Sequence, residues 1–137
     1  MVNVIDAREA IYATFVAAWG TTSALTLDGE AFSPPAGAPF VRLAVRHTGS
    51  QQESLGDVGN RKFNRVGSVF VQVFAPKDQG ARVADQLAHA ARAILEGTHF
   101  SGSDIRIFAA ATRELGPDED GYYQVNVEAA FDYTERK

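Results

Sequence analysis

The sequence predicts a single α+β domain: a mostly antiparallel sheet of four to five strands with two helices packed on one face. Two segments repeat apolar residues every three or four positions, which is typical of amphipathic helices. Several others alternate apolar and polar residues, which is typical of strands with one buried face. With 137 residues the chain fits one domain spanning 1–137, long enough to bury about two-thirds of its surface.

The first predicted helix covers residues 4–19, with Arg8 and Glu9 on its polar side. Asn3 or Asp6 can cap its start, and Gly20 can end it. Its apolar stripe consists of Val4, Ala7, Ile11, Phe15 and Ala18 or Trp19.

Weak strand character follows at residues 23–27, and a proline-rich loop at residues 31–39. Residues 40–47 then predict a strand in which Val41, Leu43 and Val45 point to one face.

Residues 48–62 have no periodic pattern and are rich in amide side chains and glycine, so they predict a long loop. Long loops inside compact domains are often functional, which makes this segment the first candidate for a partner contact. The candidate interface residues in it and just after it are Gln51, Gln52, Arg61, Lys62 and Arg65.

Residues 63–74 carry apolar groups on both faces, which indicates a strand in the middle of the sheet. Pro76 ends this strand. Asp78 is a suitable N-cap for a second helix that runs to about Glu96, where Gly97 stops it. The apolar face of this helix contains Val83, Leu87, Ala91, Ile94 and Leu95.

The chain closes with a predicted hairpin. In its first strand, Ile105, Ile107 and Ala109 alternate with Arg106, Phe108 and Ala110. A turn at residues 116–121 leads to a long final strand through residue 133. Its apolar face consists of Tyr123, Val125, Val127, Ala129, Phe131 and Tyr133.

No catalytic or metal-binding pattern stands out. The chain has no cysteine, which excludes disulfides and thiolate metal sites. His47, His89 and His99 are scattered, without the spacing that places two imidazoles on one metal. The net charge of −4 disfavours a nucleic-acid binder, and no signal peptide or membrane span is visible. We therefore expect a protein that is not an enzyme and needs no cofactor.

Three segments in this order carry a resemblance: residues 39–45 (PFVRLAV), 67–76 (GSVFVQVFAP) and 121–127 (GYYQVNV). With the N-terminal helix that ends near a Trp, the chain resembles tail terminator-like proteins of long-tailed phages and gene transfer agents. It is more distantly similar to the lambda-type minor tail protein that ends tube growth. The resemblance covers residues 5–133.

The resemblance implies a structural virion protein, assembled in the bacterial host cytoplasm and located at the junction of tail and neck. It implies a six-membered ring that caps the tail tube, ends polymerisation and docks the neck. The implied partners are further copies of the chain, the tail tube protein and a neck or head-completion protein. DNA would pass the lumen without specific binding.

Two alternatives remain open from the sequence. One is another neck or connector component of the same particle. The other is a small ligand-binding or enzymatic domain whose pocket would use Arg42, Arg46, His47 and Gln72 from adjacent strands.

Overall fold

The computed structural model describes residues 3–33, 37–98, 105–118 and 121–137. Both predicted helices and all predicted strands are present in it. In chain order the elements are α1 (Val4–Trp19), β1 (Ala24–Leu27), β2 (Phe40–Gln52), β3 (Lys62–Pro76), a 3-10 turn (Lys77–Gln79), α2 (Gly80–Leu95), β4 (Arg106–Pro117) and β5 (Tyr122–Arg136).

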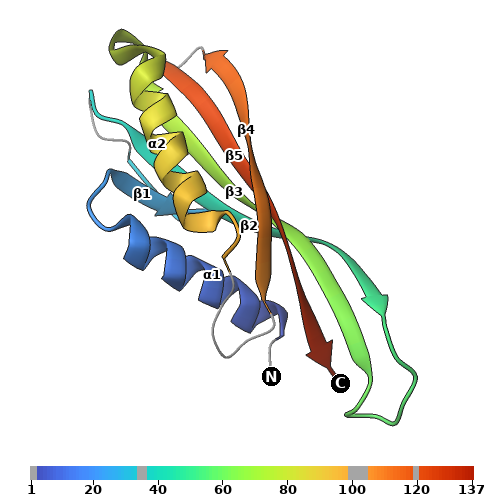
Figure 1. Cartoon of the computed structure of the whole chain (residues 1–137). Helices are drawn as coiled ribbons and strands as arrows, with labels where there is room; N and C mark the ends of the chain where they lie inside the picture. The colour runs from blue at the N-terminus through green and yellow to red at the C-terminus, as the bar shows by residue number, and fades with distance from the viewer. Residues whose placement is uncertain (1–2, 34–36, 99–104, 119–120) are drawn as a thin grey trace.

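The strands form one sheet in the order β1-β2-β3-β5-β4. All neighbouring strands are antiparallel except β1, which runs parallel to β2. Figure 1 shows both helices on the same side of this twisted sheet. The predicted fold class is confirmed, and β3 occupies the central place that its two apolar faces indicated.

The core lies between the helices and the inner face of the sheet. On α1, the predicted stripe is buried at Ala7, Ile11, Phe15 and Trp19, and the rings of Phe15 and Trp19 stack with centroids 5.4 Å apart. Asn3 caps this helix, because its Oδ1 accepts a hydrogen bond from the Asp6 amide at 2.8 Å. The buried sheet residues include Val41, Leu43, Val45, Val69, Val71, Val73, Val125, Val127 and Ala129.

The prediction that Asp78 caps the second helix is wrong. Residues 77–79 form a 3-10 turn, and α2 begins at Gly80 without a side-chain cap. Gly80 has a φ of 73°, outside the helical region, so the helix cannot continue back to Asp78. The far end agrees with the prediction: α2 ends at Leu95, and Gly97 follows with a positive φ.

The prediction that Ala109 lies on the apolar face of β4 is also wrong. The register shifts between Ile107 and Ala110, so that Ala110 is buried and Ala109 is exposed. Such a bulge inserts an extra residue and reverses the alternation beyond it. The Glu96 carboxylate accepts a hydrogen bond from the Ala110 amide at 2.8 Å and so holds the shifted strand.

The prediction of a loop over residues 48–62 holds for residues 53–61 and is wrong at both ends. Strand β2 continues to Gln52 and β3 begins at Lys62, so only residues 53–61 connect the two strands. A bulge between His47 and Gly49 breaks the alternation, and beyond it no helix covers the sheet. The apolar periodicity that marks a strand in a sequence is therefore absent there.

This extension is the most distinctive feature of the molecule. We call it the arm and define it as residues 49–66 and 132–137, the ends of β2, β3 and β5 beyond the bulge and the loop that joins β2 to β3. Figure 1 shows the arm projecting past both helices, with the C-terminus on it. The rest of the chain is called the body.

Candidate interaction surface on the arm

The arm leaves the body at a close contact between strands. Gly67 pairs with His47 on one side and Phe131 on the other. A Cβ at Gly67 would lie 2.3 Å from the Arg46 carbonyl oxygen and 2.6 Å from the Phe131 ring. Only glycine fits here without a shift of the backbone or the ring. The arm therefore starts from a tightly packed point.

His47 packs at this junction, on the face of the sheet that the helices cover. Its Nε2 lies 2.8 Å from the Tyr133 hydroxyl, and its ring meets the Phe131 ring edge-on at 5.4 Å between centroids. Burial, followed by the nearby cations Arg8 and Arg65, lowers the pKa of His47. Burial also raises the pKa of Tyr133 to about 12. Both side chains are thus neutral near pH 7.

Arg65 ties the three strands of the arm together. Its Nε donates to the Glu135 carboxylate on β5 at 3.0 Å, and its Nη1 donates to the Ser50 hydroxyl on β2. The guanidinium also lies over the Phe63 ring, 5.0 Å from its centroid. The two charged side chains are only 17% and 13% exposed. Arg65 therefore holds the arm's own strands together.

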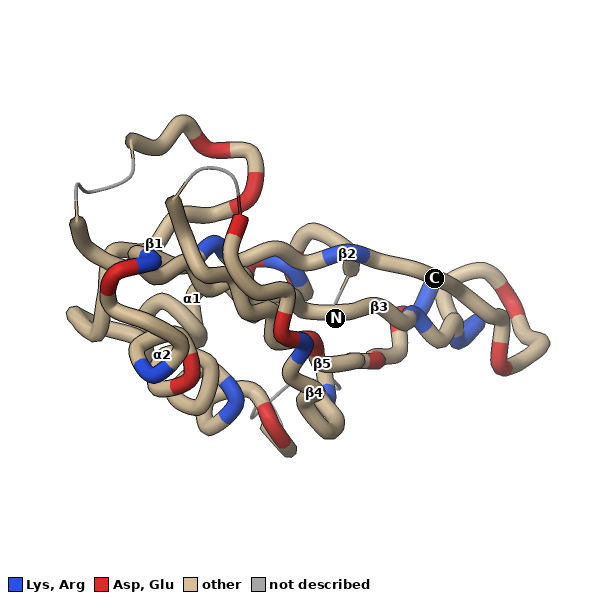
Figure 2. Tube along the Cα trace, turned by 90° about the horizontal axis from the view of Figure 1, so that it is seen from above, with Lys and Arg blue, Asp and Glu red and all other residues tan. Residues whose placement is uncertain are grey.

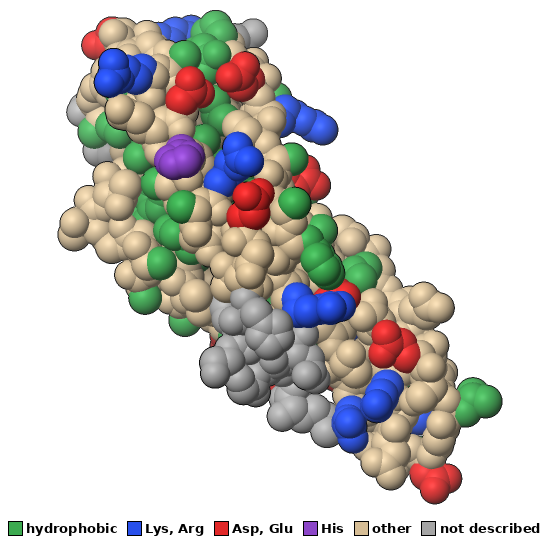
Figure 3. Space-filling view, in the orientation of Figure 1, with side chains coloured by type: hydrophobic (Ala, Val, Ile, Leu, Met, Phe, Trp, Pro, Cys, Tyr) green, Lys and Arg blue, Asp and Glu red, His purple; other side chains and the backbone are tan. Residues whose placement is uncertain are grey.

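The end of the arm exposes two large apolar side chains. Leu55 and Val58, both in the connection from β2 to β3, are 95% and 85% exposed. Figure 3 shows a hydrophobic side chain projecting near the end of an arm that is otherwise polar and charged. The next most exposed large apolar side chain in the described residues is Ile5 at 65%, so these two are the most solvent-exposed of their kind.

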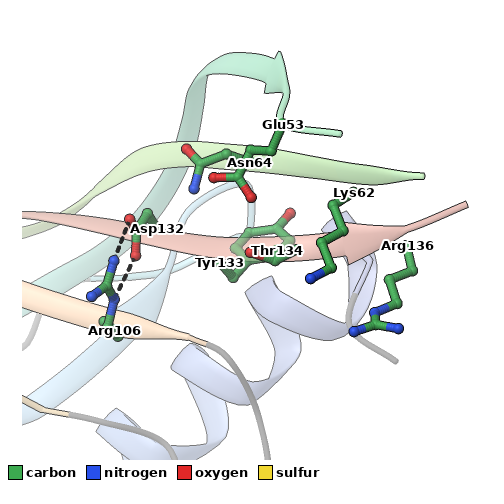
Figure 4. A pocket seen from close by; sticks show the side chains of 8 residues that line it. All are labelled: Glu53, Lys62, Asn64, Arg106, Asp132, Tyr133, Thr134 and Arg136. Atoms are coloured by element: carbon green, nitrogen blue, oxygen red, sulfur yellow. Dashed lines mark hydrogen bonds and ion pairs between the residues drawn. The ribbon is translucent and has the colours of Figure 1, made fainter. Parts of the chain in front are cut away.

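A polar hollow of about 360 Å³ lies on the arm where β3, β5 and β4 meet. At one end Arg106 makes a double hydrogen bond to Asp132, at 2.9 and 3.0 Å. At the other end Lys62 and Arg136 lie side by side on neighbouring strands (Figure 4). Glu53, Asn64, Tyr133 and Thr134 complete the lining.

The structure brings the predicted interface residues onto the arm, but in different settings. Gln51 and Gln52 are exposed on β2, and Lys62 is exposed at the start of β3. Arg61 is half-buried, with its Nε donating to the Lys137 carbonyl at 3.2 Å. The fifth predicted residue, Arg65, is engaged within the arm.

Sequence reasoning missed Leu55, Val58 and Arg136. The two apolar residues carried a usable signal, because each is an isolated aliphatic residue inside a polar, glycine-rich segment. Arg136 had no such signal, since its place beside Lys62 depends on the pairing of β3 with β5.

The four residues proposed for a ligand pocket do not come together. Arg42 lies over Phe74 with 6.0 Å to the ring centroid, and Arg46 forms an ion pair with Asp28. His47 contacts Tyr133 on the helix side of the sheet, the side opposite to Arg46. Only Arg42 and Gln72 are direct cross-strand partners.

Comparison with known families identifies the chain's class. The family model described as phage tail terminator protein matches residues 4–131, nearly the whole chain. The chain belongs to the phage tail terminator family. This confirms the resemblance expected from the sequence. The family is structural, so the chain has a structural role in the phage tail, is associated with the virion, and interacts with other tail components.

One solved protein structure shares the fold of this chain. Its TM-score is 0.65 at 19% sequence identity, with 92% of this chain and 94% of the other chain covered. A search of curated proteins found no match. In the part of the chain that the structure describes, no helix is both long and apolar enough to cross a lipid bilayer.

Proposed function

We propose that the chain caps the tail tube as a ring, ends tube polymerisation and provides the surface on which the neck docks. Membership of the terminator family supports this role, and the arm is the observation that carries it. A hairpin that projects beyond the helices with Leu55 and Val58 exposed suits insertion into a neighbouring protein. The arm is accordingly the part assigned to contact with the tube.

The ring itself consists of copies of this chain, six by the resemblance to the family. Such a ring uses a head-to-tail interface, which closes when the rotation between copies fits. DNA passes through its lumen without specific binding. The net charge of −4 favours free passage, because like charges repel.

The experiment mixes the purified chain with the tail tube protein of the same particle and measures tube lengths and tube ends by electron microscopy. We expect shorter tubes with capped ends. The Leu55→Ser, Val58→Ser double variant should leave tubes long and uncapped. Ile5→Ser is the matched control, since Ile5 is an exposed aliphatic residue (65%) on α1, away from the arm tip.

Native mass spectrometry across a concentration range tests the ring, and a closed species of six copies is expected. Tubes of unchanged length with bare ends in the presence of the wild-type chain would contradict the capping role. Binding to a neck component without binding to the tube would instead support the connector alternative.

A further inference from the structure

Two cations lie directly opposite each other on the arm. Lys62 at the start of β3 is the register partner of Arg136 near the end of β5, and both side chains are exposed. Like charges in this position repel each other and destabilise the pairing of the strands. Within the described residues neither side chain forms an ion pair. On its other side Lys62 neighbours the acidic Glu53, whose amide donates to the Lys62 carbonyl at 2.7 Å.

The surroundings make this pair more basic. Arg61 and Lys137 are the next residues along the two strands, and the Lys137 amide donates to the Arg61 carbonyl at 2.9 Å. The arm has five Lys or Arg and four Asp or Glu residues. The body has eight Lys or Arg and thirteen Asp or Glu residues. Figure 2 shows the basic residues gathered near the C-terminus, with acidic residues further toward the end of the hairpin.

We propose that Lys62 and Arg136 form a docking site for carboxylate groups on the end of the tail tube. This inference rests on the proposed function and names the chemistry of the contact. A carboxylate placed in the hollow beside both cations would remove their mutual repulsion and gain two charge-assisted hydrogen bonds. The repulsion between Lys62 and Arg136 is thus present in the free chain and relieved in the complex.

The exposed aliphatic residues favour a protein partner over a nucleic acid. Leu55 and Val58 lie in the connection between β2 and β3, which leads directly into Lys62. A protein surface can cover both an apolar and a charged contact, whereas a phosphate backbone uses cations alone.

The test is a charge reversal that separates folding from binding. Lys62→Glu places a carboxylate opposite Arg136 on β5 and beside Glu53, so the repulsive pair becomes attractive and the attractive neighbour becomes repulsive. Because these two changes oppose each other, we expect the melting temperature of this variant to stay close to that of the wild type. We expect its binding to assembled tail tubes, measured by co-sedimentation of the full chain, to fall at least about tenfold.

Lys77→Glu is the matched control, because Lys77 is an exposed lysine in the 3-10 turn outside the arm and the change in net charge is the same. It should bind tubes like the wild type. Raising the salt concentration should weaken wild-type binding more than binding of Lys62→Glu, since screening acts on the lost contact.

The outcomes are distinguishable. Failure of the wild-type chain to bind or shorten tubes would overturn the proposed function and this inference with it. Normal capping by the wild type together with equal binding of Lys62→Glu and wild type would overturn the inference alone. A DNA duplex provides a third outcome. If the chain binds duplex DNA, and Lys62→Glu weakens that binding as much as it weakens tube binding, the inference is overturned, because the site would then bind phosphate groups.

Discussion

The body and the arm use the same three central strands but are held together differently. In the body, β2, β3 and β5 turn buried apolar residues, most of them valines, toward two helices, and Val41, Val71 and Val127 are fully buried. In the arm no helix covers these strands, and Arg65 with its hydrogen-bond partners Glu135 and Ser50 replaces the apolar layer. One sheet therefore contains a part stabilised by burial and a part stabilised by polar pairs.

The difference indicates where stability and function reside. Burial of apolar area is the dominant favourable term in folding, whereas exposed polar pairs contribute little each. We expect the arm to open locally at a lower free energy than the body. Segments that adjust to a partner usually lie in such regions of low local stability. This agrees with the proposal that the arm contacts the tail tube.

The largest effect is expected from a core residue of the body. Leu43→Ala removes a fully buried side chain beneath the helices and should lower the free energy of unfolding by about 3 kcal/mol. Gln51→Ala, on the arm end of the same strand, should change it by less than about 0.5 kcal/mol. Urea denaturation measures both. Equal losses at the two positions would contradict the division into body and arm.

The junction between the two regions should be nearly as sensitive. Gly67→Ala forces a methyl group against the Arg46 carbonyl and the Phe131 ring, and should cost about 2 kcal/mol. Gly56→Ala in the arm loop is the control, because its nearest neighbour, the Asn60 carbonyl oxygen, lies at 3.6 Å. Thermal melts of the pair measure this difference. A Gly67→Ala protein as stable as Gly56→Ala would show that the strands can separate there freely.

The same division explains what the sequence could and could not predict. The bounds of α1 agree with its apolar stripe, and β3 was placed in the centre, because helix contacts impose a period on body residues. The bulges after His47 and Ile107 were not predicted, since an extra residue leaves no sign in composition. The end of β2, residues 48–52, was predicted as a loop because no apolar period marks it.

The candidate site was predicted in part. Gln51, Gln52, Arg61 and Lys62 were chosen from an unpatterned segment, and the structure places them on the projecting arm. The opposition of Lys62 and Arg136 joins residues far apart in the chain and follows only from strand register. No local pattern in a single sequence contains that information.

A moderate effect is expected within the arm. Arg65→Gln removes the ion pair with Glu135 and should cost about 1 kcal/mol, with faster tryptic cleavage after Arg61 and Lys62 as the arm opens. Arg92→Gln is the control, because its ion pair with Glu96 on α2 is long (3.8 Å) and half-exposed. Unchanged cleavage in Arg65→Gln would mean that strand pairing alone holds the arm.

The smallest effect is a pH dependence at the junction. The pKa of His47 in the folded chain lies below its ordinary value of 6.5, because the ring is buried beside Arg8 and Arg65. Between these two pKa values the unfolded chain binds the proton more readily, so the free energy of unfolding falls as the pH drops below about 6.5. In His47→Gln the free energy of unfolding should decrease less over this pH range. In His89→Gln, at an exposed position of α2, it should decrease as in the wild type. Urea denaturation at a series of pH values provides the comparison. Parallel curves for wild type and His47→Gln would mean that protonation of His47 does not loosen the contact between body and arm.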